Sequence, residues 1–143
     1  MNRDYVRVQA TAAGLINAIV NPAIDWLTAR HKGPQPIWGA EGLVVNFVIT
    51  SLILSTLVGA FAAWGVRREV RAGRFSARRP PRRGWLVGLA FGVAAAVLAI
   101  LVCGLAHAVG VTTLPLAGLM AIKAGYAGLL GFLVARSVIL RYL

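Results

Sequence analysis

Residues 86–109 read LVGLAFGVAAAVLAILVCGLAHAV and contain no aspartate, glutamate, lysine or arginine. A helix needs about 20 predominantly apolar residues to cross the hydrocarbon core of a bilayer, and this stretch is long enough. Of the 143 residues in the chain, 59% are hydrophobic and 13% are charged, which is too little charge for the surface of a soluble domain. The stretch therefore predicts an all-α integral membrane protein.

The chain contains three further apolar segments of similar length, at about 8–29, 42–65 and 114–137. Each tryptophan lies near an end of one of the four segments, where its amphipathic ring would meet the membrane–water boundary. The four tryptophans are Trp26, Trp38, Trp64 and Trp85. We predict a single membrane domain with four transmembrane helices that covers residues 1–143.

The first segment needs separate consideration, because an apolar stretch near the start of a chain can be a cleaved signal peptide. The apolar region of a signal peptide is short and continuous. This segment is longer and is interrupted by Asn17, Asn21, Pro22 and Asp25. We therefore predict a retained membrane helix.

Lysines and arginines between the segments predict the orientation, because cytoplasmic loops carry an excess of them. The loop between the second and third segments, residues 67–84, is the most basic part of the chain. Its arginines are Arg67, Arg68, Arg71, Arg74, Arg78, Arg79, Arg82 and Arg83. The loop after the first segment contains only Arg30 and Lys32. We expect both termini and the basic loop on the cytoplasmic side.

The basic loop also predicts a partner. Anionic lipid headgroups attract such a segment with about 1 kcal/mol per basic residue near the surface. The net charge of +11 would indicate nucleic acid in a soluble protein, but the loop has one aromatic residue, Phe75, and no pattern for base stacking. We predict contact with anionic lipids and no binding of nucleic acid.

Small residues recur at every fourth position in the second half of the chain. They form one stripe on the third segment and two on the fourth: Gly84, Gly88, Gly92 and Ala96; Ala117, Ala121 and Gly125; Ala124 and Gly128. Such stripes let helix backbones approach closely in lipid. They predict packing inside the four-helix unit, with a homo-oligomer interface as the alternative.

The second and fourth segments both end in arginine after a face of small residues. This similarity is consistent with two copies of a helical hairpin. Parallel repeats of this kind are related by an axis along the membrane normal.

Polar side chains inside the segments are the candidate site, because an ionisable group at membrane depth is costly unless it is paired or hydrated. The candidates are Asn17, Asn21, Asp25, Asn46, His107 and Lys123. Asn17, Asn21 and Asp25 are spaced by four and therefore share one helix face. We expect Pro22 to act as a hinge, because proline removes a helical hydrogen bond.

Several pairings are open at this point. Asp25 lies near the carboxyl end of its helix, where the helix dipole disfavours an anion, so it needs a cation. Arg30 or Lys32 could supply it locally, or Lys123 could reach outward along its flexible stem. The asparagines could instead join helices by hydrogen bonds.

Cofactor and metal sites are not predicted. His31 and His107 could ligate haem only if both lay in helices, and His31 follows the first segment. A metal site from Asp25, Glu41, His107 and Cys103 has suitable ligand types but no recognised spacing. No nucleophile–base pair or phosphate-binding glycine loop is recognisable, so an enzyme is not expected.

The sequence PIWG at 36–39 precedes a helix with scattered polar residues that ends in VRREVRAGR at 66–74. In these features the chain resembles a group of uncharacterised bacterial four-span membrane proteins that are loosely labelled permeases. Asn46 stands where a more acidic residue is expected in that group. The resemblance implies a multi-pass protein of the bacterial inner membrane.

Two classes of function fit these expectations. The first is a small permease-like or channel-like protein with a polar site in the outer half of the bilayer, which would need an oligomer because four helices enclose little volume. The second is a non-catalytic accessory or scaffold subunit of a larger membrane complex. Loss of transport in variants of Asp25 or Lys123 would distinguish the first class from the second.

Overall fold

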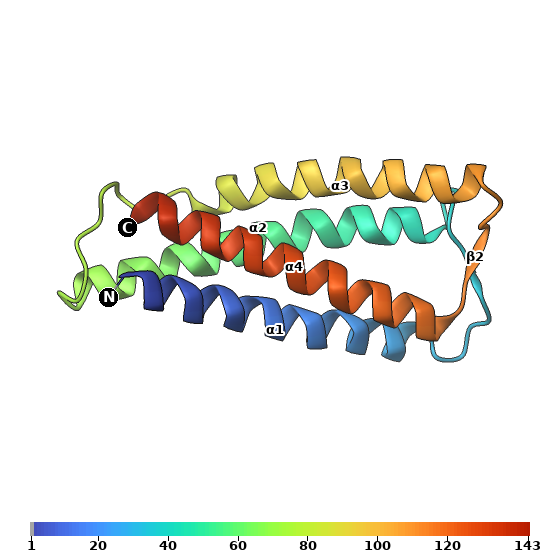
Figure 1. Cartoon of the computed structure of the whole chain (residues 1–143), viewed down its shortest axis with the longest axis horizontal. Helices are drawn as coiled ribbons and strands as arrows, with labels where there is room; N and C mark the ends of the chain where they lie inside the picture. The colour runs from blue at the N-terminus through green and yellow to red at the C-terminus, as the bar shows by residue number, and fades with distance from the viewer. Residues whose placement is uncertain (1) are drawn as a thin grey trace.

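The computed structural model describes residues 2–143, and in this range the chain forms four long helices (Figure 1). They are α1 (Asn2–Ala29), α2 (Leu43–Arg71), α3 (Gly84–Ala108) and α4 (Leu116–Tyr142). Two short strands, β1 (Gln35–Pro36) and β2 (Thr113–Leu114), pair antiparallel at one end of the bundle. The prediction of an all-α protein with four helices is confirmed.

Among the helices of residues 2–143, α2, α3 and α4 are long and apolar enough to cross a membrane. This finding supports a multi-pass membrane protein. The fourth helix, α1, does not reach the same hydropathy, because Asn17, Asn21 and Asp25 interrupt its apolar residues.

The helices extend beyond the predicted spans at the basic end of the bundle. α1 begins at Asn2 rather than near residue 8, α2 continues to Arg71 rather than residue 65, and α4 continues to Tyr142 rather than residue 137. Apolar length predicts how much helix lies in lipid, whereas helical hydrogen bonding continues through arginine, which is a good helix former.

Glycine ends α2 well before the prolines of the basic loop, Pro80 and Pro81. Gly73 has a φ of +73°, its N–H donates to the carbonyl of Val70, and the next N–H, that of Arg74, donates to Glu69. This pair of hydrogen bonds is the Schellman motif, in which a left-handed residue satisfies the last carbonyl groups of a helix.

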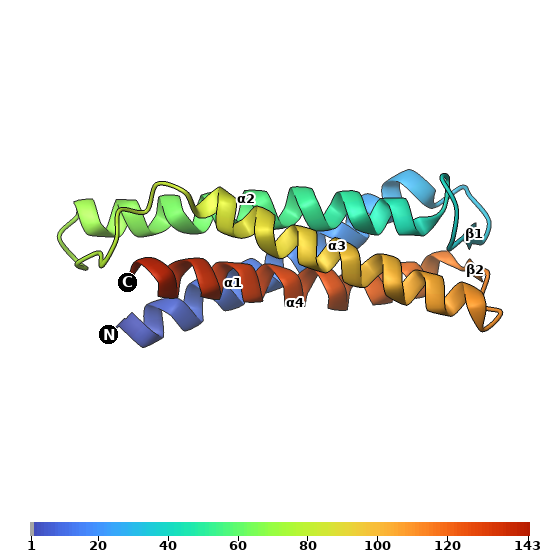
Figure 2. The same cartoon turned by 90° about the horizontal axis from the view of Figure 1, so that it is seen from above.

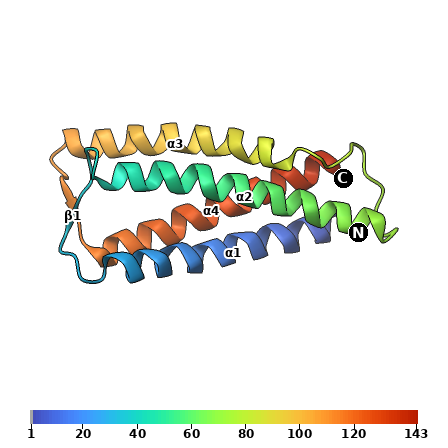
Figure 3. The same cartoon turned by 180° about the vertical axis from the view of Figure 1, so that it is seen from behind.

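The tightly packed pairs are α1 with α4 and α2 with α3, and α2 also packs on α4 (Figures 2 and 3). Within residues 2–143, the consecutive helices α1 and α2 make few contacts with each other. The first helix of each predicted hairpin therefore packs on the second helix of the other hairpin.

Equivalent contacts in the two packed pairs recur at an almost constant offset. A Cβ on Gly14 of α1 would lie 3.0 Å from the carbonyl oxygen of Gly128, and one on Gly92 of α3 would lie 2.8 Å from that of Ser51. The two contacts are offset by 78 residues on α1 and α3 (92 − 14) and by 77 on α4 and α2 (128 − 51). The strands follow the same relation, because a shift of 78 residues maps Gln35 and Pro36 of β1 onto Thr113 and Leu114 of β2, and each of the two pairs, Gln35 with Leu114 and Pro36 with Thr113, maps onto the other.

The stripes of small residues separate into internal and exposed ones. Gly84, Gly88, Gly92 and Ala96 are buried in α3, and a Cβ on Gly88 would overlap with the carbonyl oxygen of Ser55. Packing inside the unit is therefore confirmed for this stripe. The stripe of Ala117, Ala121 and Gly125 on α4 is exposed.

Candidate functional site

A buried ion pair joins α1 to α4. The Lys123 Nζ lies 3.4 Å from Asp25 Oδ2 and donates to Oδ1 at 3.5 Å. Asp25 is 4% exposed and Lys123 is 2% exposed. The sequence left Arg30, Lys32 and Lys123 open as cation partners of Asp25, and in the structure Asp25 pairs with Lys123.

Close packing of α1 on α4 positions this pair. A Cβ on Gly128 would lie 3.0 Å from the Cβ of Ala18, and Asn17 lies against Gly131. Because small residues bring the two backbones together, the short side chain of Asp25 reaches the end of the lysine stem.

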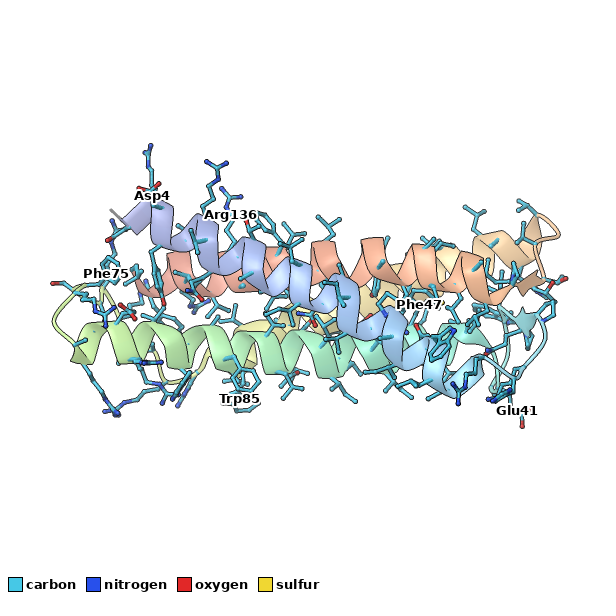
Figure 4. All side chains as sticks on the ribbon, turned by 90° about the horizontal axis from the view of Figure 1, so that it is seen from below. Asp4, Glu41, Phe47, Phe75, Trp85 and Arg136 are labelled. Carbon is cyan, nitrogen blue, oxygen red and sulfur yellow. The ribbon has the colours of Figure 1, made fainter. Side chains whose placement is uncertain are left out.

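A third helix completes the site. Asn46 of α2 accepts a short hydrogen bond from Lys123 Nζ through its Oδ1. The Nζ also lies 5.0 Å from the ring centroid of Phe47, within the range of a cation–π interaction. Figure 4 labels Phe47 in the half of the bundle that ends at Glu41. Asp25, Asn46 and Lys123 are hereafter the polar triad.

The triad is closed on one side and open on the other. Lys123 and Asp25 are buried, whereas Asn46 is exposed at the surface of the described chain. Within residues 2–143, Asp25 Oδ2 has no hydrogen-bond partner, although the ammonium of Lys123 is close. A buried carboxylate oxygen without a donor can accept a further hydrogen bond from a bound molecule.

Within residues 2–143, the side chains of Asn17 and Asn21 make no hydrogen bond to another helix. The Asn17 Nδ2 donates to the carbonyl of Ala13 at 2.8 Å, and the Asn21 Nδ2 donates to that of Asn17 at 3.2 Å. Both amides bind the backbone of their own helix, so the expected interhelical role holds only for Asn46. Pro22 is buried inside α1, which remains one helix through this position.

His107 lies outside the triad. It is exposed, and its ring stacks on Trp38 with 6.3 Å between the ring centroids. Glu41 is also exposed, at the end of the bundle that holds the strands. In the range 2–143, no group of three or more His, Cys, Asp or Glu residues comes together as a metal site.

Tyr126 makes contacts that the sequence did not predict. Its hydroxyl forms a short hydrogen bond with Ser51 of α2 and lies 3.3 Å from the carbonyl oxygen of Ala95 on α3. Its ring meets that of Phe47 edge to face, with centroids 5.3 Å apart. The only signal in the sequence was the spacing of three residues between Lys123 and Tyr126, which places both on one side of α4.

A groove of about 260 Å³ lies between α1 and α2, with Ala135 and Ile139 of α4 at its floor. Tyr5, Gln9 and Asn17 contribute polar groups to it. Asn17, Asn21 and Asp25 are spaced by four and share one face of α1, whereas Gln9 is turned about 160° away from Asp25 around the helix. The sequence did not indicate Tyr5 and Gln9 as groove residues, because Tyr5 precedes the apolar segment and Gln9 lies at its start.

The basic loop folds against the ends of the helices. Phe75 packs on Tyr5 with 5.1 Å between ring centroids, and the N–H of Arg78 donates to the carbonyl of Tyr142 at 2.8 Å. Burial raises the pKa of the Tyr5 hydroxyl, the nearby carboxylate of Glu69 raises this pKa further, and Arg74 opposes them. The labelled Asp4, Phe75 and Arg136 lie at this end in Figure 4.

Comparison with models of protein families, with curated proteins and with solved structures finds no match. The resemblance to four-span proteins labelled permeases therefore stays a prediction.

Proposed function

We propose that the protein is a small permease-like or channel-like membrane protein whose solute site is the polar triad. In this proposal α1 is the fourth membrane span and the basic end of the bundle is cytoplasmic. The triad then lies in the outer half of the bilayer, which the resemblance places in a bacterial inner membrane.

The observation that supports this proposal is the convergence of three polar side chains from three helices on one point. A cation and an anion at 3.4 Å compensate each other, so the site is neutral overall and can remain buried. A small polar solute can exchange with either partner, because Lys123 offers N–H donors and Asp25 offers an oxygen without a donor.

The arrangement of α1 and α2 supplies a route to the triad. These two helices make few contacts with each other, and the groove between them contains polar groups towards the basic end of the bundle. Asn17 lines this groove and shares one face of α1 with Asn21 and Asp25, so a solute that leaves the triad would follow this face towards the groove. Pro22, the proposed hinge, lies between Asn21 and Asp25.

The offset contacts support two parallel hairpins with an axis along the membrane normal. Lys123 and Asn46 occupy equivalent positions in this relation, because they differ by the same 77 residues as Gly128 and Ser51 (123 − 46). The axis would pass near their hydrogen bond. A central position is where a repeat protein places its solute site.

The proposal includes an oligomer, since the described residues enclose grooves rather than a continuous pore. The exposed stripe of Ala117, Ala121 and Gly125 on α4 is the face on which a second copy would pack. The arginines of the basic loop would contact anionic lipids at the cytoplasmic surface.

Proteoliposome swelling tests the proposed function. Vesicles with the protein are diluted into isosmotic glycine, ammonium acetate, methylammonium chloride or sorbitol, and light scattering reports solute entry. We expect entry of at least one charged or zwitterionic solute above the rate of empty vesicles. Glu41→Gln, which changes an exposed carboxylate outside the triad, should leave the rate unchanged. The rate of empty vesicles for every solute would contradict the proposal.

The accessory subunit remains the second candidate, and one observation favours it. Both partners of the ion pair are buried, and the pair joins two helices, as a purely structural contact would also do. Purification in mild detergent followed by native mass spectrometry separates the two. A foreign subunit in fixed stoichiometry would support the accessory role.

A further inference from the structure

A second cavity lies at the strand end of the bundle, between α2, α3 and α4, with a volume of about 270 Å³. Its lining includes Phe47, Ala99, Val102, Cys103, Ala106 and Ile122. In the described chain its exposed surface is entirely apolar. Water is therefore not stabilised in it, because a buried water needs polar partners.

The cavity opens between α3 and α4. These two helices contact each other far less than either contacts α2. The side chains at the opening are apolar and exposed: Leu98 is 57% exposed, Val102 57% and Ile122 50%. On helices apolar enough to cross a membrane, such side chains face lipid, so the cavity is continuous with the membrane-facing surface.

We propose that this cavity binds one hydrocarbon chain of a membrane lipid. An apolar void without an occupant loses dispersion contacts along its lining, and only lipid chains are abundant on the side where it opens. Leu114 of β2 and Ile37, which directly follows β1, limit the cavity at the strand end, so the hydrocarbon chain enters along α3 and α4.

A lipid chain in the cavity would contact a residue that lies next to the polar triad. Phe47 lines the cavity, and the same ring lies 5.0 Å from the Nζ of Lys123. Tyr126 lines the cavity as well and packs on Phe47. The lipid site and the ion pair thus share a wall, although the lipid site does not depend on the proposed transport.

Native mass spectrometry of protein released from bacterial membranes in mild detergent tests the proposal. We expect a lipid to remain on the wild-type chain and to be lost from Ala106→Phe, which fills the cavity. Ala94→Phe makes the same change at an exposed position of α3 outside the cavity and should keep the lipid. Equal retention in both variants, or no retained lipid on the wild-type chain, would overturn the proposal.

A measurement on the wild-type protein covers the case in which Ala106→Phe does not fold. The protein is placed in vesicles of phosphatidylethanolamine and phosphatidylglycerol, of which a small fraction carries a diazirine on one acyl chain. After illumination, we expect adducts concentrated on residues 98–106 and 122–126. Adducts spread evenly over the lipid-facing residues of all helices would mean ordinary solvation by lipid and would overturn the proposal.

Discussion

At the scale of single residues, the ion pair between Asp25 and Lys123 is the most consequential feature of the molecule. Both side chains are buried, and their charges compensate each other. Removing one partner of a buried pair leaves an uncompensated charge, which costs about 3–5 kcal/mol, whereas removing both often costs little.

We therefore predict strong non-additivity in a double-mutant cycle of Asp25 and Lys123. Asp25→Asn and Lys123→Met should each lower the free energy of unfolding by about 3–5 kcal/mol. Thermal unfolding in detergent should show this loss as a marked decrease of the midpoint temperature. The double variant should recover most of that loss. Glu41→Gln, at an exposed carboxylate, serves as the control. Additive losses would show that the two charges do not interact.

The residues of the site were predictable to different degrees. The spacing of Asn17, Asn21 and Asp25 gave their common face, and the depth of Lys123 required a partner. Which cation would pair with Asp25 depended on the rotation of α1 and α4 about their axes. The roles of Asn46 and Tyr126 depended on the packing of α2 and α3. Because α3 is apolar on all sides, only its stripe of small residues indicates its inner face, and the stripe does not say which helix that face meets.

At the scale of elements, glycine determines how α2 and α3 pack. Gly59, Gly84 and Gly88 bring the backbones so close that a methyl group on Gly88 would overlap with the carbonyl oxygen of Ser55. This oxygen belongs to the backbone and cannot rotate away. Glycines such as Gly88 are therefore required for packing within the chain, whereas Gly125 has no neighbour within residues 2–143 that an added methyl group would meet.

A matched pair of substitutions tests this difference. Gly88→Ala should destabilise the protein by about 1–3 kcal/mol, as overpacking of a close contact does. Gly125→Ala should be neutral or slightly stabilising, because nothing lies within 4 Å of the added methyl group and alanine favours helix. Thermal unfolding of the monomer in detergent compares them, because the proposed second copy would contact Gly125 in the oligomer. A larger loss for Gly125→Ala than for Gly88→Ala in the monomer would contradict the assigned packing.

Apolar length predicted all four helix ends at the strand end of the bundle, and the start of α3, within two residues. It missed the first turns of α1 and the last turns of α2 and α4, which lie outside the apolar segments. Gly73, with positive φ, follows the end of α2, so a reading based on glycine caps would have placed that end more closely.

At the scale of the whole molecule, the two ends of the bundle differ in charge. The ends of the described chain and the basic loop lie at one end, and the strands lie at the other (Figure 1). This arrangement is what four spans with a cytoplasmic basic end require. It depends on α1 crossing the membrane despite its lower hydropathy.

Cysteine accessibility tests the crossing of α1. In a Cys103→Ala background, Gly33→Cys should react with a membrane-impermeant maleimide in intact cells, since it follows α1 and is exposed. Asn2→Cys, which is exposed at the other end of α1, should react only after the cells are opened. Reaction of both positions from the same side would show that α1 does not span.

The central claim is that the polar triad is a solute site and more than a contact between helices. Solute entry into proteoliposomes with the double variant Asp25→Asn/Lys123→Met tests it most directly, because this variant should remain folded. We predict wild-type oligomeric state and stability near that of the wild type, with solute entry at the rate of empty vesicles. Entry at the wild-type rate in the double variant would contradict the claim and leave the ion pair a structural contact.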